Sequence, residues 1–231
     1  MTPPKIPQPT GAMNPLFIRR PLHPRSKSTR SSPVRNDKIP QKHMWIVTGP
    51  AGCGKSTVAA FLSQQLQLPY IEGDDYHPAL NKEKMTKGIP LTDADRWDWL
   101  ITLRDAAASA LQASSTRTGV VVTCSALKRK YRDVIRVAAY NNHGISVHFL
   151  YLHASEQTLM ARVAARQGHF MGAAMVHSQF ESLEVPGETE MKDVIAVDVN
   201  GPLSEVKAFA LEMVREELGV EEEVRRKSQE Y

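Results

Sequence analysis

One short stretch of the chain combines glycines with a lysine and two hydroxyl residues. Residues 49–57 read GPAGCGKST, which matches the pattern GxxxxGK[ST]. The glycines let the backbone curl so that several N–H groups converge on one phosphate, and a helix that starts here adds positive potential. The lysine of such a loop reaches the β- and γ-phosphates, and the hydroxyl that follows it holds Mg²⁺. We therefore expect a site for ATP and Mg²⁺ that comprises Gly49, Gly52, Cys53, Gly54, Lys55, Ser56 and Thr57.

A cluster of acids follows the next apolar segment. Residues 72–75 read EGDD and come directly after the short run 69–71. In open α/β sheets, ligands bind beyond the carboxyl ends of the strands, so at least one carboxylate should face the γ-phosphate. A hydroxyl acceptor needs a group that orients it and takes its proton, and an aspartate does this in kinases. Asp74 is our candidate for this base, whereas Asp75 is better explained as a helix cap.

Apolar runs alternate with helical patterns from Met44 onward. The β-branched run at residues 120–124 does not alternate with polar residues, which is typical of a strand covered on both faces. Strands that alternate with helices predict an α/β fold with a five-stranded parallel sheet and helices on both faces. The expected strands are 44–48, 69–71, 120–124, 147–152 and 194–197, and the expected helices are 55–67, 78–87, 93–113, 128–140, 155–167 and 203–218.

Other classes of phosphate-loop protein fit less well. No guanine-binding motif of the type NKxD is present, which argues against a GTPase, and the strand at 120–124 ends in Thr-Cys-Ser without an acid. The acids stand after the second strand instead, a layout that suits kinases of nucleotides and small metabolites.

The charge of the chain is unevenly placed. Residues 1–43 hold nine lysines and arginines against one acid, Asp37, together with nine prolines, so the rest of the chain is net acidic. We predict a disordered, basic, proline-rich tail over residues 1–42, a kinase domain over 43–220 and a charged, frayed end over 221–231. The pI of about 9.1 reflects the tail, so it is no evidence that the domain binds nucleic acid.

The cysteines and the termini bear on location. Cys53 and Cys124 show neither metal-ligand spacing nor a disulfide framework. No apolar run approaches the roughly 20 residues of a membrane span, and the N-terminus lacks the apolar core of a secretory signal. We expect a cytoplasmic protein without a membrane partner. Mitochondrial targeting is the alternative, because the tail is rich in Arg and Ser, although its prolines oppose an amphipathic helix.

Five segments together resemble the small, phosphate-loop type of gluconokinase. They read GPAGCGKST, GDDYHPALNKEKMTKGIPLTDADRWDWL, CSALKRKYRD, ARQGHF and QFESLEVPGE, and they occur in the family's order over about residues 45–200. The resemblance implies the fold of shikimate and nucleoside monophosphate kinases, with a substrate-binding lobe and a mobile lid. It also implies ATP-dependent phosphorylation of D-gluconate to 6-phosphogluconate, and a homodimer, since relatives are often dimers.

The resemblance extends to particular residues on the acceptor side. Asp74 matches the family's acceptor-side aspartate, and Glu72 aligns with a carboxylate near Mg²⁺, where bacterial relatives tend to have aspartate. His77 is a candidate for a hydrogen bond to a substrate hydroxyl, with a purely structural role as the alternative. Trp97 and Trp99 are better explained by packing.

Cationic residues are candidates for the sugar-acid carboxylate and the transferring phosphate. Lys128 and Arg132 stand four apart on the expected helix, and arginine can bind a carboxylate with two parallel hydrogen bonds. Arg96 is a further candidate, and a surface ion pair with a neighbouring aspartate is its alternative. Arg162 and Arg166 resemble the start of the lid, whose arginines reach the phosphoryl group on closure.

Two other functions stay open at this point. A kinase for another acceptor, such as shikimate or a nucleoside monophosphate, would use the same loop. A non-catalytic protein that binds nucleotide or nucleic acid through the basic tail would bind ATP without turning over any acceptor.

Overall fold

A computed structural model describes the backbone of residues 41–113, 118–165 and 173–227. Five strands form one sheet in the order β2-β3-β1-β4-β5, and every neighbouring pair is parallel. The predicted α/β class and five-stranded parallel sheet are therefore confirmed. The strands are β1 (Lys42–Thr48), β2 (Tyr70–Ile71), β3 (Gly119–Thr123), β4 (Ile145–His153) and β5 (Val194–Asp198).

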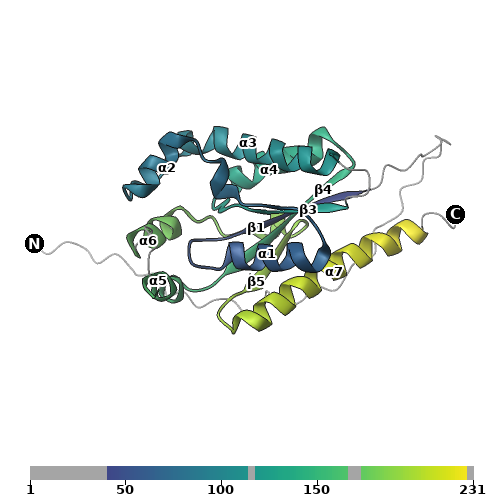
Figure 1. Cartoon of the computed structure of the whole chain (residues 1–231). Coiled ribbons are helices and arrows are strands. Elements are labelled where there is room, and N and C mark those ends of the chain that lie inside the picture. The colour runs from purple at the N-terminus through teal and green to yellow at the C-terminus, as the bar shows by residue number, and fades with distance from the viewer. Residues whose placement is uncertain (1–40, 114–117, 166–172, 228–231) are drawn as a thin grey trace, which may run out of the picture. The chain divides into compact units, whose positions relative to one another are not determined.

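Helices cover both faces of this sheet, as Figure 1 shows. They are α1 (Lys55–Leu66), α2 (Ala79–Thr86), α3 (Asp93–Gln112), α4 (Arg129–Asn141), α5 (Glu156–Ala164), α6 (Ala173–Ser182) and α7 (Leu203–Lys227). Two short 3-10 turns, η2 (Gly73–Tyr76) and η3 (Glu188–Glu190), complete the described elements. Within the described ranges, none of the helices combines the length and the hydrophobicity that crossing a bilayer requires.

The central strand β1 separates two hydrophobic cores. Its side chains alternate between the faces, so that Trp45 and Val47 pack with residues of α1, α5 and α7. Met44 and Ile46 pack with residues of α3 and α4 on the other face. Because all four side chains are almost completely buried, β1 is held from both sides at the point where it runs into the glycine-rich loop.

The ends of the domain differ from the sequence-based boundaries. β1 begins at Lys42 rather than Met44, and the Gln41 side chain donates a hydrogen bond to the Ser146 hydroxyl at 2.7 Å. Helix α7 continues to Lys227, so most of the segment predicted as a frayed end has a helical backbone. Residues 1–40, the greater part of the predicted tail, lie outside the described residues.

Helix α6 was not predicted from the sequence. Its alanines, methionine and glutamine are good helix formers, but the segment follows the glycine-containing stretch that we assigned to the lid. The helix predicted over 155–167 is α5, which ends at Ala164 with Ala165 as its C-cap, and residues 166 and 167 lie outside the described residues.

Candidate active site

The phosphate loop leads from β1 into α1, and its glycines are required by its shape. Gly49 has φ 139°, and a Cβ atom there would lie 2.4 Å from the carbonyl oxygen of Leu152 in β4. Gly54 caps α1 with φ 95°, in the left-handed region that side chains disfavour. The loop can therefore curl closely against the sheet and present the N-terminus of α1, with Ser56 and Thr57 in its first turn.

The Lys55 side chain folds over the loop. Its Nζ donates hydrogen bonds to the carbonyl oxygens of Gly49 and Pro50, both at 3.0 Å. Cys53 is only 2% exposed, and burial raises the pKa of its thiol although Lys55 opposes that shift. A nucleotide would meet the ammonium group of Lys55 and the backbone of the loop, whereas the Cys53 thiol is buried.

The acidic turn is fixed against β3 through Gly73. Its N–H donates to the Thr123 hydroxyl at 2.9 Å, and its carbonyl oxygen accepts from the Trp99 indole at 2.8 Å. A Cβ atom on Gly73 would lie 2.0 Å from the Thr123 carbonyl oxygen, so no other residue fits this approach. The backbone that carries Glu72 and Asp74 is therefore held in place by the sheet.

Glu72 lies beside the loop hydroxyl that is predicted to bind metal. The carboxylate accepts hydrogen bonds from the hydroxyls of Thr123 and Tyr70. Burial opposes ionisation, but the hydrogen bonds from Thr123, Tyr70 and Ser56 outweigh it and lower the pKa of Glu72. An ionised carboxylate next to a hydroxyl is a donor set that suits Mg²⁺, which takes few protein ligands and completes its shell with phosphate and water.

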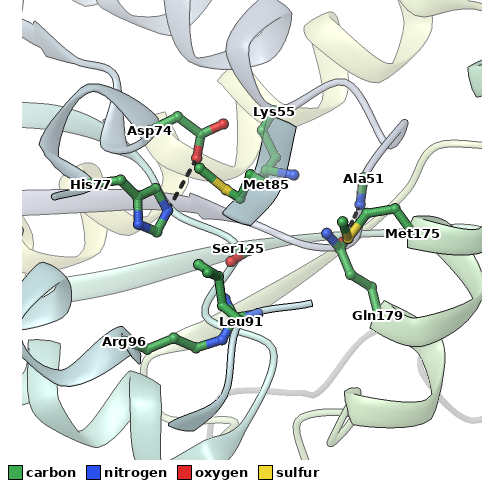
Figure 2. A pocket seen from close by; sticks show the side chains of 10 residues that line it. All are labelled: Ala51, Lys55, Asp74, His77, Met85, Leu91, Arg96, Ser125, Met175 and Gln179. Carbon is green, nitrogen blue, oxygen red and sulfur yellow. Dashed lines mark hydrogen bonds and ion pairs between the residues drawn. The ribbon is translucent and has the colours of Figure 1, made fainter. Parts of the chain in front are cut away.

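Asp74 and Asp75 differ in their surroundings. Asp74 lines the same pocket as Lys55 (Figure 2), whereas Asp75 does not line it and bonds through its backbone, with its carbonyl oxygen accepting from Lys82 Nζ at 2.9 Å. The side chain of Asp74 keeps 61% of its surface exposed. Desolvation within the cleft and the nearby Glu72 and Asp75 nevertheless raise its pKa, while Lys55 lowers it. A raised pKa makes this carboxylate a better proton acceptor than an ordinary surface aspartate.

His77 lines the same pocket as Asp74. Its ring stacks on Trp99 at 4.0 Å, and burial together with Arg96 and Lys82 lowers its pKa to about 4, so it is neutral near pH 7. The Asn81 amide nitrogen lies 3.5 Å from His77 Nδ1. Because that amide can only donate, Nδ1 accepts and Nε2 carries the proton. Nε2 lies 3.9 Å from Asp74 Oδ1, which is beyond hydrogen-bond distance.

The remaining cations separate into two groups. Arg96 lines the pocket and lies over the Tyr131 ring at 5.6 Å, and it forms no ion pair with any described residue. Lys128 does not line the pocket, because its Nζ bonds the Asp93 carboxylate at 2.9 Å. Lys130 and the Tyr131 hydroxyl bond the same carboxylate, and these contacts hold the pKa of Asp93 well below its usual range.

One pocket thus collects residues from the loop, the acidic turn, the α2–α3 lobe, the end of β3 and α6 (Figure 2). Two of these elements, α2 and α6, also supply apolar side chains to its walls. The lining residues are Ala51, Lys55, Asp74, His77, Met85, Leu91, Arg96, Ser125, Met175 and Gln179.

Comparison with known proteins identifies the family to which this chain belongs. Residues 44–186 match the family model described as an AAA domain. A probable gluconokinase from Schizosaccharomyces pombe is 44% identical over 183 residues, which cover 79% of this chain and 93% of that protein. The chain belongs to the gluconokinase family.

Two further relatives agree with this assignment. The thermoresistant gluconokinase of Escherichia coli is 39% identical over 173 residues, which cover 75% of this chain and 94% of that protein. The crystal structure of a gluconokinase from Sinorhizobium meliloti has a TM-score of 0.64 and 41% identity, and the match covers 79% of this chain and 98% of that one. The resemblance on which the sequence analysis relied is therefore confirmed.

Arg132 does not lie where the sequence analysis of this gluconokinase-family chain placed it. Its guanidinium is 1% exposed and binds both carboxylate oxygens of Glu190, at 2.9 and 2.7 Å. It also donates to the carbonyl oxygens of Ala126 and Leu127, at 3.1 and 3.2 Å. The predicted substrate contact is corrected, because every nitrogen of this side chain is already bonded to protein.

The expected pairing of Lys128 with Arg132 fails for a geometric reason. Lys128 is the N-cap residue of α4 and has an extended backbone, so the helical spacing of four residues does not place the two side chains on one face. Arg132 instead holds the loop that follows β3, and that loop carries Ser125 into the pocket. Its role in this structure is to position the pocket wall.

The arginines assigned to the lid are only partly described. Arg162 donates a hydrogen bond to the Val199 carbonyl oxygen at 2.5 Å and does not line the pocket. Its charge is nevertheless close enough to the loop to lower the pKa of Cys53. Arg166 lies outside the described residues.

Several residues of the pocket were not predicted from the sequence. Met85, Leu91, Ser125 and Gln179 fall inside the segments that carry the family resemblance, but none of them has a charge or a spacing that points to a role. Met175 lies outside those segments.

We expect Glu190→Gln to destabilise the domain by about 3 kcal/mol, because it leaves the buried Arg132 without an anionic partner. Arg136 would lose a partner as well, since its guanidinium lies 2.9 Å from the same carboxylate. The free energy of unfolding from urea titration measures the effect. Glu188→Gln, an exposed neighbour in the same turn, is the matched control and should change that free energy by less than about 0.5 kcal/mol. Equal effects from both variants would contradict the role of the pair.

Proposed function

We propose that this protein transfers the γ-phosphoryl group of ATP to a hydroxyl of D-gluconate, giving ADP and 6-phosphogluconate. The observation that carries the proposal is that Lys55 of the phosphate loop and Asp74 of the acidic turn line one pocket. Gluconokinases that are about 40% identical over most of the chain support gluconate as the acceptor.

The residues divide the reaction between them. Lys55 moves from the Gly49 and Pro50 carbonyl oxygens to the β- and γ-phosphates, together with the N–H groups of the loop. Ser56 and Glu72 would hold Mg²⁺, which would supply charge neutralisation for the phosphates. Although the described residues contain no group of three or more acids, histidines or cysteines around a metal position, such a group is not needed when phosphate oxygens complete the shell.

On the acceptor side, Asp74 takes the proton of the attacking hydroxyl, and His77, which lines the same pocket, donates a hydrogen bond to a substrate hydroxyl. Arg96 binds the carboxylate of the sugar acid, since it lines the pocket and has no ion-pair partner among the described residues. Lys128 binds the same substrate carboxylate if it gives up its ion pair with Asp93. Arg162 and Arg166 complete the charge around the phosphoryl group when the lid closes.

We further propose a cytoplasmic location. The two cysteines support it, because both are free and buried, as expected under reducing conditions.

An acceptor panel tests the function. Full-length protein with ATP and Mg²⁺ should release ADP with D-gluconate, and much more slowly with shikimate, with nucleoside monophosphates or without an acceptor. Faster ADP release with one of the other acceptors than with gluconate would show that acceptor to be the substrate. ATP binding without acceptor-dependent turnover would favour a non-catalytic nucleotide-binding protein.

A further inference from the structure

Gln179 of α6 reaches the phosphate loop. Its Oε1 accepts a hydrogen bond from the Ala51 N–H at 2.7 Å, across 128 residues of sequence. Within the described part of the chain, no other side chain from outside the loop accepts a hydrogen bond from a loop N–H. The contact therefore joins α6 to the group that would receive the nucleotide's phosphates.

The orientation of the Gln179 amide follows from its partner. The Ala51 N–H can only donate, so the atom that faces it must be the oxygen. The amide nitrogen then carries two N–H donors, and no described residue accepts from them. Figure 2 shows the carboxamide beside Ala51, in the pocket that Lys55 and Asp74 also line.

The donors of Gln179 thus have no described acceptor, in a pocket that Lys55 and Asp74 also line. The γ-phosphoryl group must cross this pocket when it moves from ATP to a hydroxyl near Asp74. Its three equatorial oxygens carry the negative charge, and a pre-oriented donor aimed at them lowers the barrier. A neutral amide does this without adding another cation beside Lys55.

Helix α6 is well placed to hold such a donor. Just beyond its end, the Glu184 N–H donates to the Leu127 carbonyl oxygen at 2.9 Å. The Glu184 carboxylate accepts from the Arg129 N–H at 2.8 Å. The segment that follows α6 is thereby fastened to the start of α4, so the position of Gln179 is set by more than its contact with Ala51.

We propose that Gln179 is a further catalytic residue, whose Oε1 holds the Ala51 N–H while its amide nitrogen donates to the γ-phosphoryl oxygens of ATP. This inference rests on the proposed kinase function and adds a residue to it. It requires that Gln179 distinguish ATP from ADP, because ADP lacks the group that the amide nitrogen would touch.

Two substitutions test the acceptor oxygen and the donor nitrogen of the Gln179 amide separately. Gln179→Glu keeps an oxygen for the Ala51 N–H but replaces the donor with a negative charge. Gln179→Leu keeps much of the bulk and removes both the acceptor and the donor. Glu181→Gln, an exposed position on the same helix, is the matched control and should leave all constants within about twofold.

We expect Gln179→Glu to lower kcat with gluconate by about 100-fold, as loss of one transition-state donor does. Gln179→Leu should lower kcat at least about tenfold. In both variants the affinity for a non-hydrolysable ATP analogue should fall, and the affinity for ADP should stay within about twofold. Steady-state kinetics and calorimetric titration of full-length protein measure these quantities, and circular dichroism checks folding.

Other outcomes overturn the proposal in distinguishable ways. If Gln179→Glu turns over like wild type while Gln179→Leu is impaired, the side chain only holds the loop. If both variants lose affinity for the ATP analogue and for ADP by the same factor, Gln179 shapes the nucleotide site without touching the γ-phosphoryl group. The titrations need no acceptor, so they stand even if wild-type protein proves inactive on gluconate. That last result would refute the proposed function alone.

Discussion

Replacing Asp74 with asparagine should lower the rate constant at saturating gluconate by about 10²–10⁴-fold and leave ATP affinity nearly unchanged. A sugar hydroxyl is a very weak acid, so its proton must leave as the bond to phosphorus forms. Asparagine keeps the shape and the hydrogen bonding of the side chain but cannot take that proton. Steady-state kinetics with gluconate and a separate ATP titration measure the two effects.

Asp75→Asn is the matched control for this prediction. It makes the same chemical change one residue away, on a side chain that does not line the pocket, so it should cost much less. If Asp75→Asn is the crippled enzyme and Asp74→Asn is nearly normal, the base is misassigned by one residue. Normal turnover by both variants would show that the acidic turn is not part of the acceptor site.

The pH dependence of the wild-type enzyme follows from the same group. The pKa of Asp74 is raised above the ordinary 3.8 of an aspartate, first by desolvation and then by Glu72 and Asp75. Below that raised pKa the carboxylate is protonated and cannot accept a proton. The acid limb of the kcat/KM profile should therefore lie above pH 3.8, and Asp74→Asn should abolish it.

Lys55→Ala should reduce turnover at least about 100-fold, because a cation that acts on the transferring phosphoryl group is lost. Folding should survive, since the ammonium group bonds only two loop carbonyl oxygens and faces the pocket. Turnover and a thermal melt of the same preparation are the measurements. Lys87→Ala, which removes an exposed cation on the lobe, is the control and should leave both near wild type. A folded Lys55→Ala protein with near wild-type turnover would remove the loop from the reaction.

The strands and the phosphate loop were predictable because their signals are local. A continuous β-branched run such as Val120-Val121-Val122 has one stable place, in a sheet covered on both faces, and the loop's glycines have a backbone reason to be there. The acidic turn followed from the rule that ligands bind beyond strand ends, because Glu72 and Asp74 come directly after a strand.

The errors at Arg132 and Gln179 share one physical cause, which is that the partners of a polar side chain are not local. Arg132 looked like a free cation, but its partner Glu190 stands 58 residues away and buries it. Gln179 carried no charge and so no signal, yet folding brings it to Ala51 from 128 residues away. Contacts of this kind are fixed by packing, which helical spacing in the sequence cannot express.

The attachment of the phosphate loop to β1 has a consequence for how the two sides of the pocket move. The side chains of Met44, Trp45, Ile46 and Val47 are buried in two cores, so amide hydrogens of β1 should exchange with solvent only when the whole domain unfolds. Among the described side chains of α6, Val176 alone is fully buried. Breaking the contact between Gln179 and Ala51 therefore needs only a local opening of α6, during which the strand that carries the phosphate loop stays folded.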